Sequence, residues 1–280
     1  MMTFLAPSLA HWAPLDSRAT IALSGADWRS YLHGLVTQDV ETLAPGELRF
    51  AALLTPQGRL LFDLFLLGRE DGCIIECAAE HRAALLQRLK MYRLRARVEI
   101  GESDAPVEAL WGADAAPEGW SRDPRAPDLG FRAYGAPAPR GAVLADETAY
   151  EAHRLALGVP GPADWGHDKS YPIEANFDLL GGIDFRKGCF VGQETTSRMK
   201  RRGTIKNRMA PIAVDGPPPP VGARLLAGEL RAGEVSSSSD TGAMALLRLD
   251  RLGEGPLALE DGRPWRVVWP VWMKQVKEAG

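Results

Sequence analysis

The periodicity of the sequence changes near residue 206, and this change constrains the fold more than any other feature. Before it, segments with the 3.6-residue period of helices alternate with strand-like segments. After it, short β-type runs are separated by turn-forming residues: the prolines at 217–220, the polar run 236–240 and Asp261-Gly262. A chain of 280 residues can hold two or three packed units. The sequence therefore predicts an α+β body at residues 1–205, divisible into two subdomains, and a small β-barrel or sandwich at residues 206–280.

Local patterns in the body predict its helices and strands. Strands are expected at residues 19–23, 48–54, 59–67, 73–77 and 94–100, and helices at 28–36, 79–92, 146–157 and 193–202. The tight turn Thr55-Pro56-Gln57-Gly58 predicts that the second and third of these strands form a hairpin. A stretch rich in Pro, Ala and Asp at 113–128 is expected to be a loop or an internal boundary.

The composition is that of an ordinary globular protein, with 45% hydrophobic and 25% charged residues. A net charge of −3 provides no global attraction to nucleic acid or to an anionic membrane. Residues 1–15 contain no basic segment of the kind that begins a signal peptide. No run approaches the roughly 18 uncharged apolar residues that a membrane span needs. We therefore expect a soluble, cytoplasmic protein without a membrane or nucleic-acid partner.

The chain has three cysteines, Cys73, Cys77 and Cys189, and an odd number without a secretion signal indicates free thiols. Cys73 and Cys77 fall on one expected strand, where four residues span roughly 13 Å. That separation is too large for a disulfide or for two ligands of one zinc ion, so both are expected in the core. The sequence contains no C-x2-C pair and no H-E-x-x-H, and we expect no protein-bound metal.

The third cysteine lies in a segment of unusual composition, Asp184-Phe185-Arg186-Lys187-Gly188-Cys189-Phe190-Val191-Gly192-Gln193-Glu194. Two cations precede Cys189, and a helix is expected to begin shortly after it. Both features favour the reactive thiolate. The glycines permit a sharp turn or the close approach of a ligand. The alternative is a buried cysteine that packs within a tight turn.

Residues 187–194 resemble the signature of the YgfZ-type folate-binding proteins, which are relatives of the glycine-cleavage T-protein (aminomethyltransferase). Further resemblances extend over nearly the whole chain. Tyr31–Val40 is similar to an early "FLQG-x-x-TND" segment, and Leu53–Asp63 to a hairpin that ends in paired aspartates. Arg154–Gly158 is similar to "RLEAG" and Tyr171–Ala175 to "TP-x-EA". The resemblance implies a T-protein-like folate-binding body.

The same resemblance implies site residues for tetrahydrofolate. Glu174 takes the place of a carboxylate that binds the pterin ring, and Asp63 that of the second aspartate of the hairpin. Phe62 and Ala156 replace the two other family acids, which counts against methylene-transfer chemistry. From the residues themselves, Asp63 in its apolar strand must be paired, hydrogen-bonded or on the exposed face of the strand. Arg198 is the cation that we expect to bind a ligand carboxylate, and we expect His167 to lie outside the site.

The leading hypothesis is a tetrahydrofolate-binding protein that supports assembly or repair of iron–sulfur clusters, with client or assembly proteins as partners. In it Cys189 and Asp63 carry the chemistry, and the signature residues Lys187, Gly188, Gly192, Gln193 and Glu194 surround the thiol. A true aminomethyltransferase is the first alternative. The second is a non-catalytic scaffold for protein or RNA that uses the basic segments 88–97 and 198–208. The latter segment lacks aromatic residues for base stacking, so RNA is not the expected partner.

Overall fold

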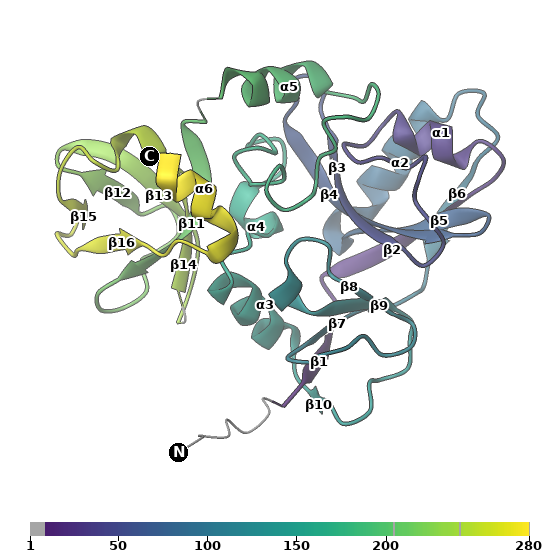
Figure 1. Cartoon of the computed structure of the whole chain (residues 1–280), viewed down its shortest axis with the longest axis horizontal. Helices are drawn as coiled ribbons and strands as arrows, with labels where there is room; N and C mark the ends of the chain where they lie inside the picture. The colour runs from purple at the N-terminus through teal and green to yellow at the C-terminus, as the bar shows by residue number, and fades with distance from the viewer. Residues whose placement is uncertain (1–8, 204, 241, 280) are drawn as a thin grey trace.

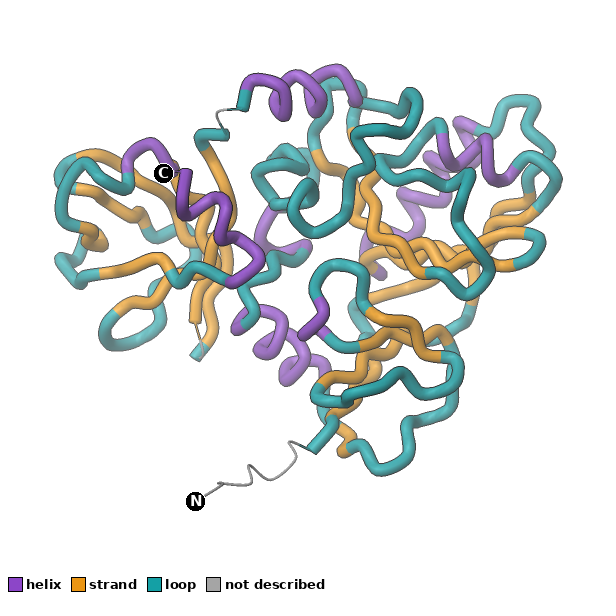
Figure 2. Tube along the Cα trace, in the orientation of Figure 1, coloured by secondary structure: helices purple, strands orange, loops and turns teal. Residues whose placement is uncertain are grey.

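The computed structural model describes residues 9–203, 205–240 and 242–279 of the chain. The body is built on two sheets, and a third sheet forms a separate C-terminal unit (Figure 1). Strands dominate both parts, and the helices lie around them (Figure 2). The predicted α+β body followed by a C-terminal barrel is confirmed. Residues 1–8, part of the N-terminal segment without basic residues, lie outside the described part.

The first sheet is antiparallel and has the order β3-β4-β5-β2-β6. Its strands are β2 (Arg18–Ser24), β3 (Leu48–Leu54), β4 (Leu60–Arg69), β5 (Gly72–Ala78) and β6 (Glu99–Ser103). Helices α1 (Trp28–His33) and α2 (Arg82–Tyr92), with the short 3-10 helix η1 (Ala79–His81), pack on one face. Every residue of β4 except Arg69 is buried, because its other face packs against the second sheet.

The strand expected at 94–100 begins later, at Glu99, and that prediction is wrong in its first five residues. Leu94 has a φ of 46°, in the left-handed region, and so ends the helix rather than starting a strand. Leu94, Ala96 and Val98 alternate as residues of a strand do, but they lie before β6, whereas Ile100 lies within β6 and pairs with Leu23.

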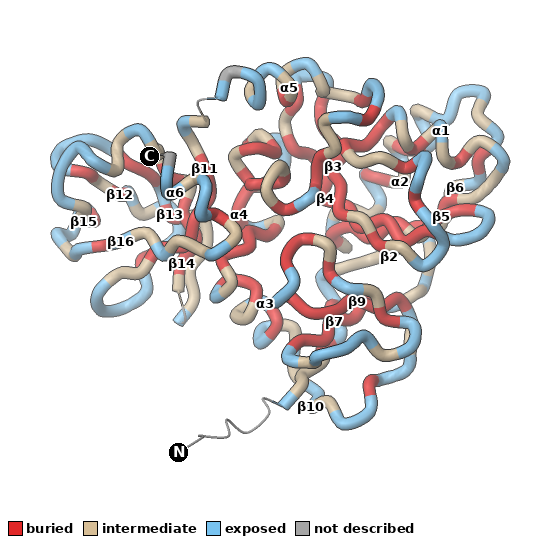
Figure 3. The backbone as a smooth tube through the Cα atoms, in the orientation of Figure 1, coloured by how far each residue is buried: buried red, intermediate tan, exposed pale blue. Residues whose placement is uncertain are grey.

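The second sheet has the order β10-β1-β7-β9-β8, with β1 and β10 parallel and the other pairs antiparallel. Its strands are β1 (His11–Pro14), β7 (Val107–Trp111), β8 (Trp120–Arg122), β9 (Phe131–Tyr134) and β10 (Val143–Leu144). The stretch 113–128 is therefore not only loop, since it contains β8 and the start of the 3-10 helix η2 (Pro127–Leu129). Figure 3 shows buried segments along β7 and β9, where the two sheets of the body face each other.

Three further helices connect the body to the barrel: α3 (Glu147–Ala156), α4 (Pro162–Trp165) and α5 (Gln193–Arg202). Asp146 caps α3 by accepting a hydrogen bond from the backbone N–H of Ala149 at 2.8 Å. Gly203, with a φ of 72°, follows α5 as its left-handed C-cap. The helices expected at 146–157 and 193–202 are confirmed to within a residue.

The C-terminal unit is a nearly closed six-stranded barrel with the order β15-β12-β13-β14-β11-β16. Its strands are β11 (Asn207–Val214), β12 (Arg224–Ala227), β13 (Leu230–Ser239), β14 (Gly242–Arg248), β15 (Leu257–Leu259) and β16 (Trp265–Val267). An isolated bridge between Ala258 and Pro264 brings the two edge strands together. The remaining elements are η3 (Leu249–Arg251), η4 (Val271–Met273) and the short helix α6 (Lys274–Ala279). Among the described residues, no helix is long and apolar enough to cross a bilayer.

Candidate functional site

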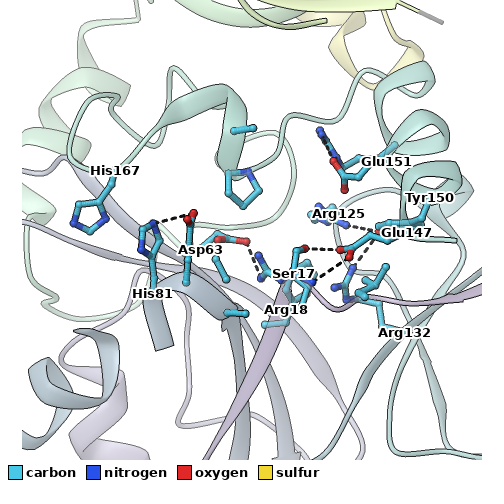
Figure 4. A pocket seen from close by; sticks show the side chains of 18 of the residues that line it. Ser17, Arg18, Asp63, His81, Arg125, Arg132, Glu147, Tyr150, Glu151 and His167 are labelled. Atoms are coloured by element: carbon cyan, nitrogen blue, oxygen red, sulfur yellow. Dashed lines mark hydrogen bonds and ion pairs between the residues drawn. The ribbon is translucent and has the colours of Figure 1, made fainter. Parts of the chain in front are cut away.

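A cavity of about 820 Å³ opens between the first sheet, helix α3 and the loop that follows α4. Arg18 and Asp63 come from neighbouring regions of the sheet, His81 from η1, Tyr150 from α3 and His167 from the loop (Figure 4). Ligand cavities in proteins commonly have volumes of roughly 300–1,000 Å³. This cavity is therefore large enough for a small organic ligand.

Asp63 is buried in the wall of this cavity and does not face solvent. Its Oδ2 atom lies 2.9 Å from Nη2 of Arg18, and the two side chains are only 6% and 8% exposed. Nε of Arg18 lies 2.6 Å from Oε1 of Glu76. The guanidinium therefore joins two carboxylates, which explains how an acid is accommodated in an apolar strand. Of the three explanations that the sequence allows for Asp63, pairing with a cation is the one observed.

Glu76 is the centre of a wider buried network beneath the cavity. It accepts hydrogen bonds from Nε of Arg132 at 3.0 Å and from the hydroxyl of Tyr134 at 2.7 Å. Burial opposes ionisation of Glu76, but Arg132 and Arg18 outweigh it and lower its pKa. Burial and the negative charge of Glu76 together raise the pKa of Tyr134 far above its usual range. Glu76 is thus an ionised carboxylate that fixes Arg18, and through Arg18 it fixes Asp63.

Two histidines that the sequence does not place in the site meet at the cavity wall. The ring centroids of His81 and His167 lie 4.9 Å apart, and the ring of Phe62 lies 5.4 Å from that of His167. Nδ1 of His167 lies 2.9 Å from the carbonyl oxygen of Leu61, which can only accept. That contact assigns the Nδ1 proton and leaves Nε2 for other partners. No local motif signals this pair, because the two residues are far apart in sequence.

Glu174 lies in a second cavity, of about 540 Å³, between the body and the barrel. Its Oε2 accepts a hydrogen bond from the backbone N–H of Tyr171, and its Oε1 accepts one from Nδ2 of Asn207, each at 3.0 Å. Ala163 and Gly166 line both cavities. The two cavities are neighbours across the α4 turn, with Asp63 in one and Glu174 in the other.

The signature segment is anchored to the body by Lys187. Its ammonium group donates to the carbonyl oxygens of His33 and of Val36, the latter at 2.7 Å, at the end of α1. Burial lowers the pKa of Lys187 to about 8, although nearby acids such as Asp39 oppose the effect. The main hydrogen-bonding role of this lysine is therefore to satisfy the end of helix α1.

Gly192 provides a second anchor for the signature. Its φ is 79°, and a Cβ at this position would lie 2.6 Å from the carbonyl oxygen of Thr55. Only glycine combines that backbone conformation with so close an approach. The signature is thus fixed on one side to α1 and on the other to the β3–β4 turn.

Cys189 lies between these two anchors and is exposed. Cys73 and Cys77 are buried in β5 as expected, and burial raises the pKa of each thiol to about 12. Gly188 and Glu194 are also exposed, whereas Gln193 is half-buried at the start of α5. Of the three cysteines, all in described segments, Cys189 alone is available to another molecule.

Arg198 is exposed on α5 and does not line the cavity that contains Asp63. The residues singled out from the sequence therefore occupy separate places: Asp63, Glu174, the exposed Cys189 and Arg198 do not converge on one pocket. Among the described residues, no group of three or more His, Cys, Asp or Glu side chains is arranged to hold a metal ion.

Comparison with known proteins shows the family to which the chain is related. Residues 206–275 match the family described as the CAF17 C-terminal beta-barrel domain. The mouse (Mus musculus) iron–sulfur cluster assembly factor IBA57, a mitochondrial protein, is 30% identical over 288 residues, which cover 88% of this chain and 79% of the mouse protein. This chain belongs to the IBA57 family. The resemblance that we inferred from the sequence is confirmed.

Two fungal IBA57 homologues are similar over a smaller share of their length. The protein of Coccidioides immitis is 32% identical, with 74% of this chain and 57% of the relative covered. That of Phaeosphaeria nodorum is 36% identical, with 71% and 54% covered. The chain thus spans a little over half of the length of these relatives. Both are named as mitochondrial, like the mouse protein, and these names overturn our expectation of a cytoplasmic protein.

The fold also matches a solved structure. The crystal structure of the glycine cleavage system aminomethyltransferase T from Bartonella henselae superimposes with a TM-score of 0.77, covering 94% of this chain and 86% of that protein. The sequence identity is 16%, so the likeness concerns the fold alone. The IBA57-family chain therefore has the T-protein-like fold that the sequence predicted.

Proposed function

We propose that this IBA57-family protein supports the assembly or repair of iron–sulfur clusters, with Cys189 as the acting thiol and tetrahydrofolate as its ligand. The names of the relatives support the first part of the proposal. The single observation that carries the role of Cys189 is the contrast among the cysteines, since Cys189 is exposed and Cys73 and Cys77 are buried. A thiol must be reachable to attack a substrate or to bind a metal of a cluster.

The fixed position of Cys189 supports a functional thiol. Lys187 and Gly192 hold the backbone on both sides of it, as described above. A group held in place on a rigid support loses little conformational entropy when a partner binds. Cys189 would therefore serve as a preformed point of attachment for a partner protein or its cluster.

The Asp63 cavity is the proposed place for the folate. Arg18 keeps Oδ2 of Asp63 in position, and a carboxylate held in this way can accept hydrogen bonds from the amino and ring N–H groups of a pterin. Leu15 and Phe65 also line the cavity and make part of its wall apolar. Glu174, in the adjoining cavity, is the second carboxylate that could accept hydrogen bonds from the N–H groups of a pterin.

Binding of tetrahydrofolate and its effect on thermal stability would test the ligand. At a ligand concentration of about 100 times Kd, the free energy of unfolding should rise by about 2.7 kcal/mol. Asp63→Asn should weaken binding about 10- to 150-fold if Asp63 accepts a charge-assisted hydrogen bond from the ligand. Glu174→Gln is the matched comparison, because it changes the carboxylate of the neighbouring cavity. An absence of stabilisation in the wild-type protein would contradict the ligand proposal.

The role of Cys189 requires a test in cells. Cys189→Ser retains the shape of an exposed side chain and should leave folding unchanged while impairing iron–sulfur enzymes in cells that lack the native protein. Full restoration of those enzymes by the variant would show that the thiol is dispensable. Ser197→Ala, on α5 beside the signature, is a suitable control for a small change of the same surface.

Aminomethyl transfer is disfavoured by the two replaced family acids, although Asp63 is retained. Ala156, at the position of a family acid, lies at the end of α3 and lines a different cavity, of about 220 Å³. Phe62 is buried and packs against the two histidine rings. Release of ammonia from an aminomethyl carrier by the purified protein would contradict this conclusion.

A further inference from the structure

The turn after helix α2 exposes two large apolar side chains. Met91 is 61% exposed and Leu94 is 86% exposed. They lie in a segment on the side of the body away from the barrel (Figure 1). Single exposed apolar residues are common on soluble proteins and need no explanation. Three further features of this turn distinguish it.

The first feature is the backbone of Leu94. Its φ of 46° places a residue with a Cβ in the left-handed region, where the end of a helix normally carries Gly or Asn. The exposed side chain gains little burial that could offset this strain. Backbone strain of this kind persists where the surrounding structure holds it in place, and it is concentrated at functional sites.

The second feature is that hydrogen bonds anchor the segment on both sides of the turn. The carbonyl oxygen of Leu89 accepts a hydrogen bond from the hydroxyl of Tyr31 at 2.5 Å. At the other end, Asp27 accepts from the backbone N–H of Arg97 at 2.8 Å and from its Nη2 at 2.9 Å. The backbone on both sides of Leu94 is thus anchored to the body, while the Leu94 side chain itself projects into solvent.

The third feature is the charge of the surroundings. Residues 81–98 contain six Arg or Lys residues and no Asp or Glu: Arg82, Arg88, Lys90, Arg93, Arg95 and Arg97. Arg82 pairs with Glu102 and Arg97 with Asp27. Lys90, Arg93 and Arg95 are exposed, and within the described part of the chain they form no ion pair.

We propose that Met91 and Leu94, with the cations Lys90, Arg93 and Arg95, form a docking surface for a protein. The complementary face would have an apolar pocket for Leu94 bordered by Asp and Glu side chains. We call these five residues the Leu94 surface. They line neither the Asp63 cavity nor the Glu174 cavity, so this surface is separate from the proposed ligand site.

Other occupants fit the observations less well. A nucleic acid would neutralise the cations but would leave Met91 and Leu94 in water. An anionic membrane would accept both cations and apolar groups, yet a fluid bilayer gains nothing from a turn whose backbone is anchored on both sides. A protein pocket of matching shape would benefit from the anchored turn, because a preorganised anchor loses less entropy on binding.

Leu94→Asn separates docking from folding. Asn tolerates the left-handed region better than Leu, so the variant should have a Tm equal to or higher than that of the wild type. It should nevertheless lose the partner, because the apolar anchor is gone. Val271→Asn is the matched control, since Val271 is 93% exposed on the barrel side of the chain. A clearly lower Tm for Leu94→Asn would overturn the argument from strain.

The partner can be identified by a photoreactive benzoylphenylalanine in place of Leu94 in the full chain, expressed in its own cells. We expect cross-links to one protein, mapped by mass spectrometry to a segment bordered by Asp or Glu. Calorimetry with that purified protein should show at least about tenfold weaker binding for Leu94→Asn and for the double variant Arg93→Glu/Arg95→Glu, with Val271→Asn unchanged. Equal binding by all variants would overturn the proposal.

The same variants distinguish the other occupants. Wild-type protein that binds phosphatidylserine vesicles, with binding lost in Leu94→Asn, would assign the surface to lipid and contradict a protein partner. Cross-links scattered over abundant proteins without an acidic segment in common would contradict it as well.

Discussion

Gly58 and Gly192 pack backbone against backbone, so that a Cβ on Gly192 would lie 2.9 Å from the Cα of Gly58. A Cβ on Gly58 would in turn lie 3.1 Å from the carbonyl oxygen of Gly192. Both residues have φ near +80°, at 85° and 79°. The β3–β4 turn and the signature are therefore fitted to each other, although they lie far apart in the sequence. The position of Cys189 depends on this contact.

Gly192→Ala should be strongly destabilising. The new methyl group would meet backbone atoms on two sides, and the left-handed φ adds strain. We expect a loss of at least about 3 kcal/mol in the free energy of unfolding, measured by urea denaturation. Gly203→Ala is the control, because Gly203 has a φ of 72° but a Cβ on it would meet no described atom within 4 Å beyond its chain neighbours. It should lose only about 1–2 kcal/mol, and equal losses would contradict the importance of the contact.

The glycines show how far the sequence could predict the fold. The turn at 55–58 and the helix at 193–202 are recognisable from local signals, and both are present. The contact between the turn and the signature cannot be recognised from the sequence, because nothing in either segment specifies which other segment it packs against. The error at residues 94–98, which precede β6, has a related cause: the alternation of Leu94, Ala96 and Val98 is local, whereas Asp27, which holds Arg97 in the turn, comes from a different element.

Arg18→Met should expose the dependence of Asp63 and Glu76 on a shared cation. Breaking a buried ion pair from one side leaves a carboxylate without compensation, and we expect a loss of about 3–5 kcal/mol at neutral pH. The loss should shrink in acid, where Glu76, whose pKa Arg18 helps to lower in the folded protein, takes up a proton. Arg248→Met removes a pair with Asp250 at the protein surface, where both side chains are 35% exposed, and should cost no more than about 1 kcal/mol. Chemical denaturation of both variants at neutral and acidic pH provides the comparison.

The composition of the site could be anticipated only in part. Asp63 is identifiable because an acid in an apolar strand requires a partner, but Arg18 and Glu76 come from other strands and carry no motif. The sequence gives no reason to include His167 in the site, since a histidine in a loop of this kind is more often structural than a general base. Its contact with His81 depends on the fold alone. The family resemblance implies that Glu174 and Asp63 belong to one folate site. In the structure they line two different cavities, which meet at the α4 turn.

Lys187 should make stability rise with pH on the alkaline side of neutrality. Burial lowers its pKa to about 8 in the folded protein, whereas an unfolded lysine has a pKa of about 10.4. Between these values the unfolded chain binds more protons, so the free energy of unfolding of the wild type increases with pH. Lys187→Met should lack this increase, and Lys274→Met, at an exposed site, should retain it.

The cysteines do not obscure that measurement. Burial raises the pKa of Cys73 and of Cys77 to about 12, so the unfolded chain loses these protons first and stability falls with pH. Because both thiols are present in every variant, their effect cancels in the difference between wild type and Lys187→Met. A difference that stays constant from about pH 7 to pH 10 would contradict the buried-lysine explanation.

Alkylation should distinguish Cys189 from the other two cysteines in the folded protein. The thiolate is the reacting form, and Cys73 and Cys77 are both buried and, with pKa values raised to about 12, almost fully protonated at neutral pH. Iodoacetamide should therefore add one group per chain, at Cys189, as judged by intact mass and peptide mapping. Cys189→Ser should remain unmodified on the same timescale and should gain two groups only in denaturant. Rapid labelling of Cys73 or Cys77 in the folded variant would show that β5 opens readily, and it would remove the contrast in accessibility on which the assignment of Cys189 depends.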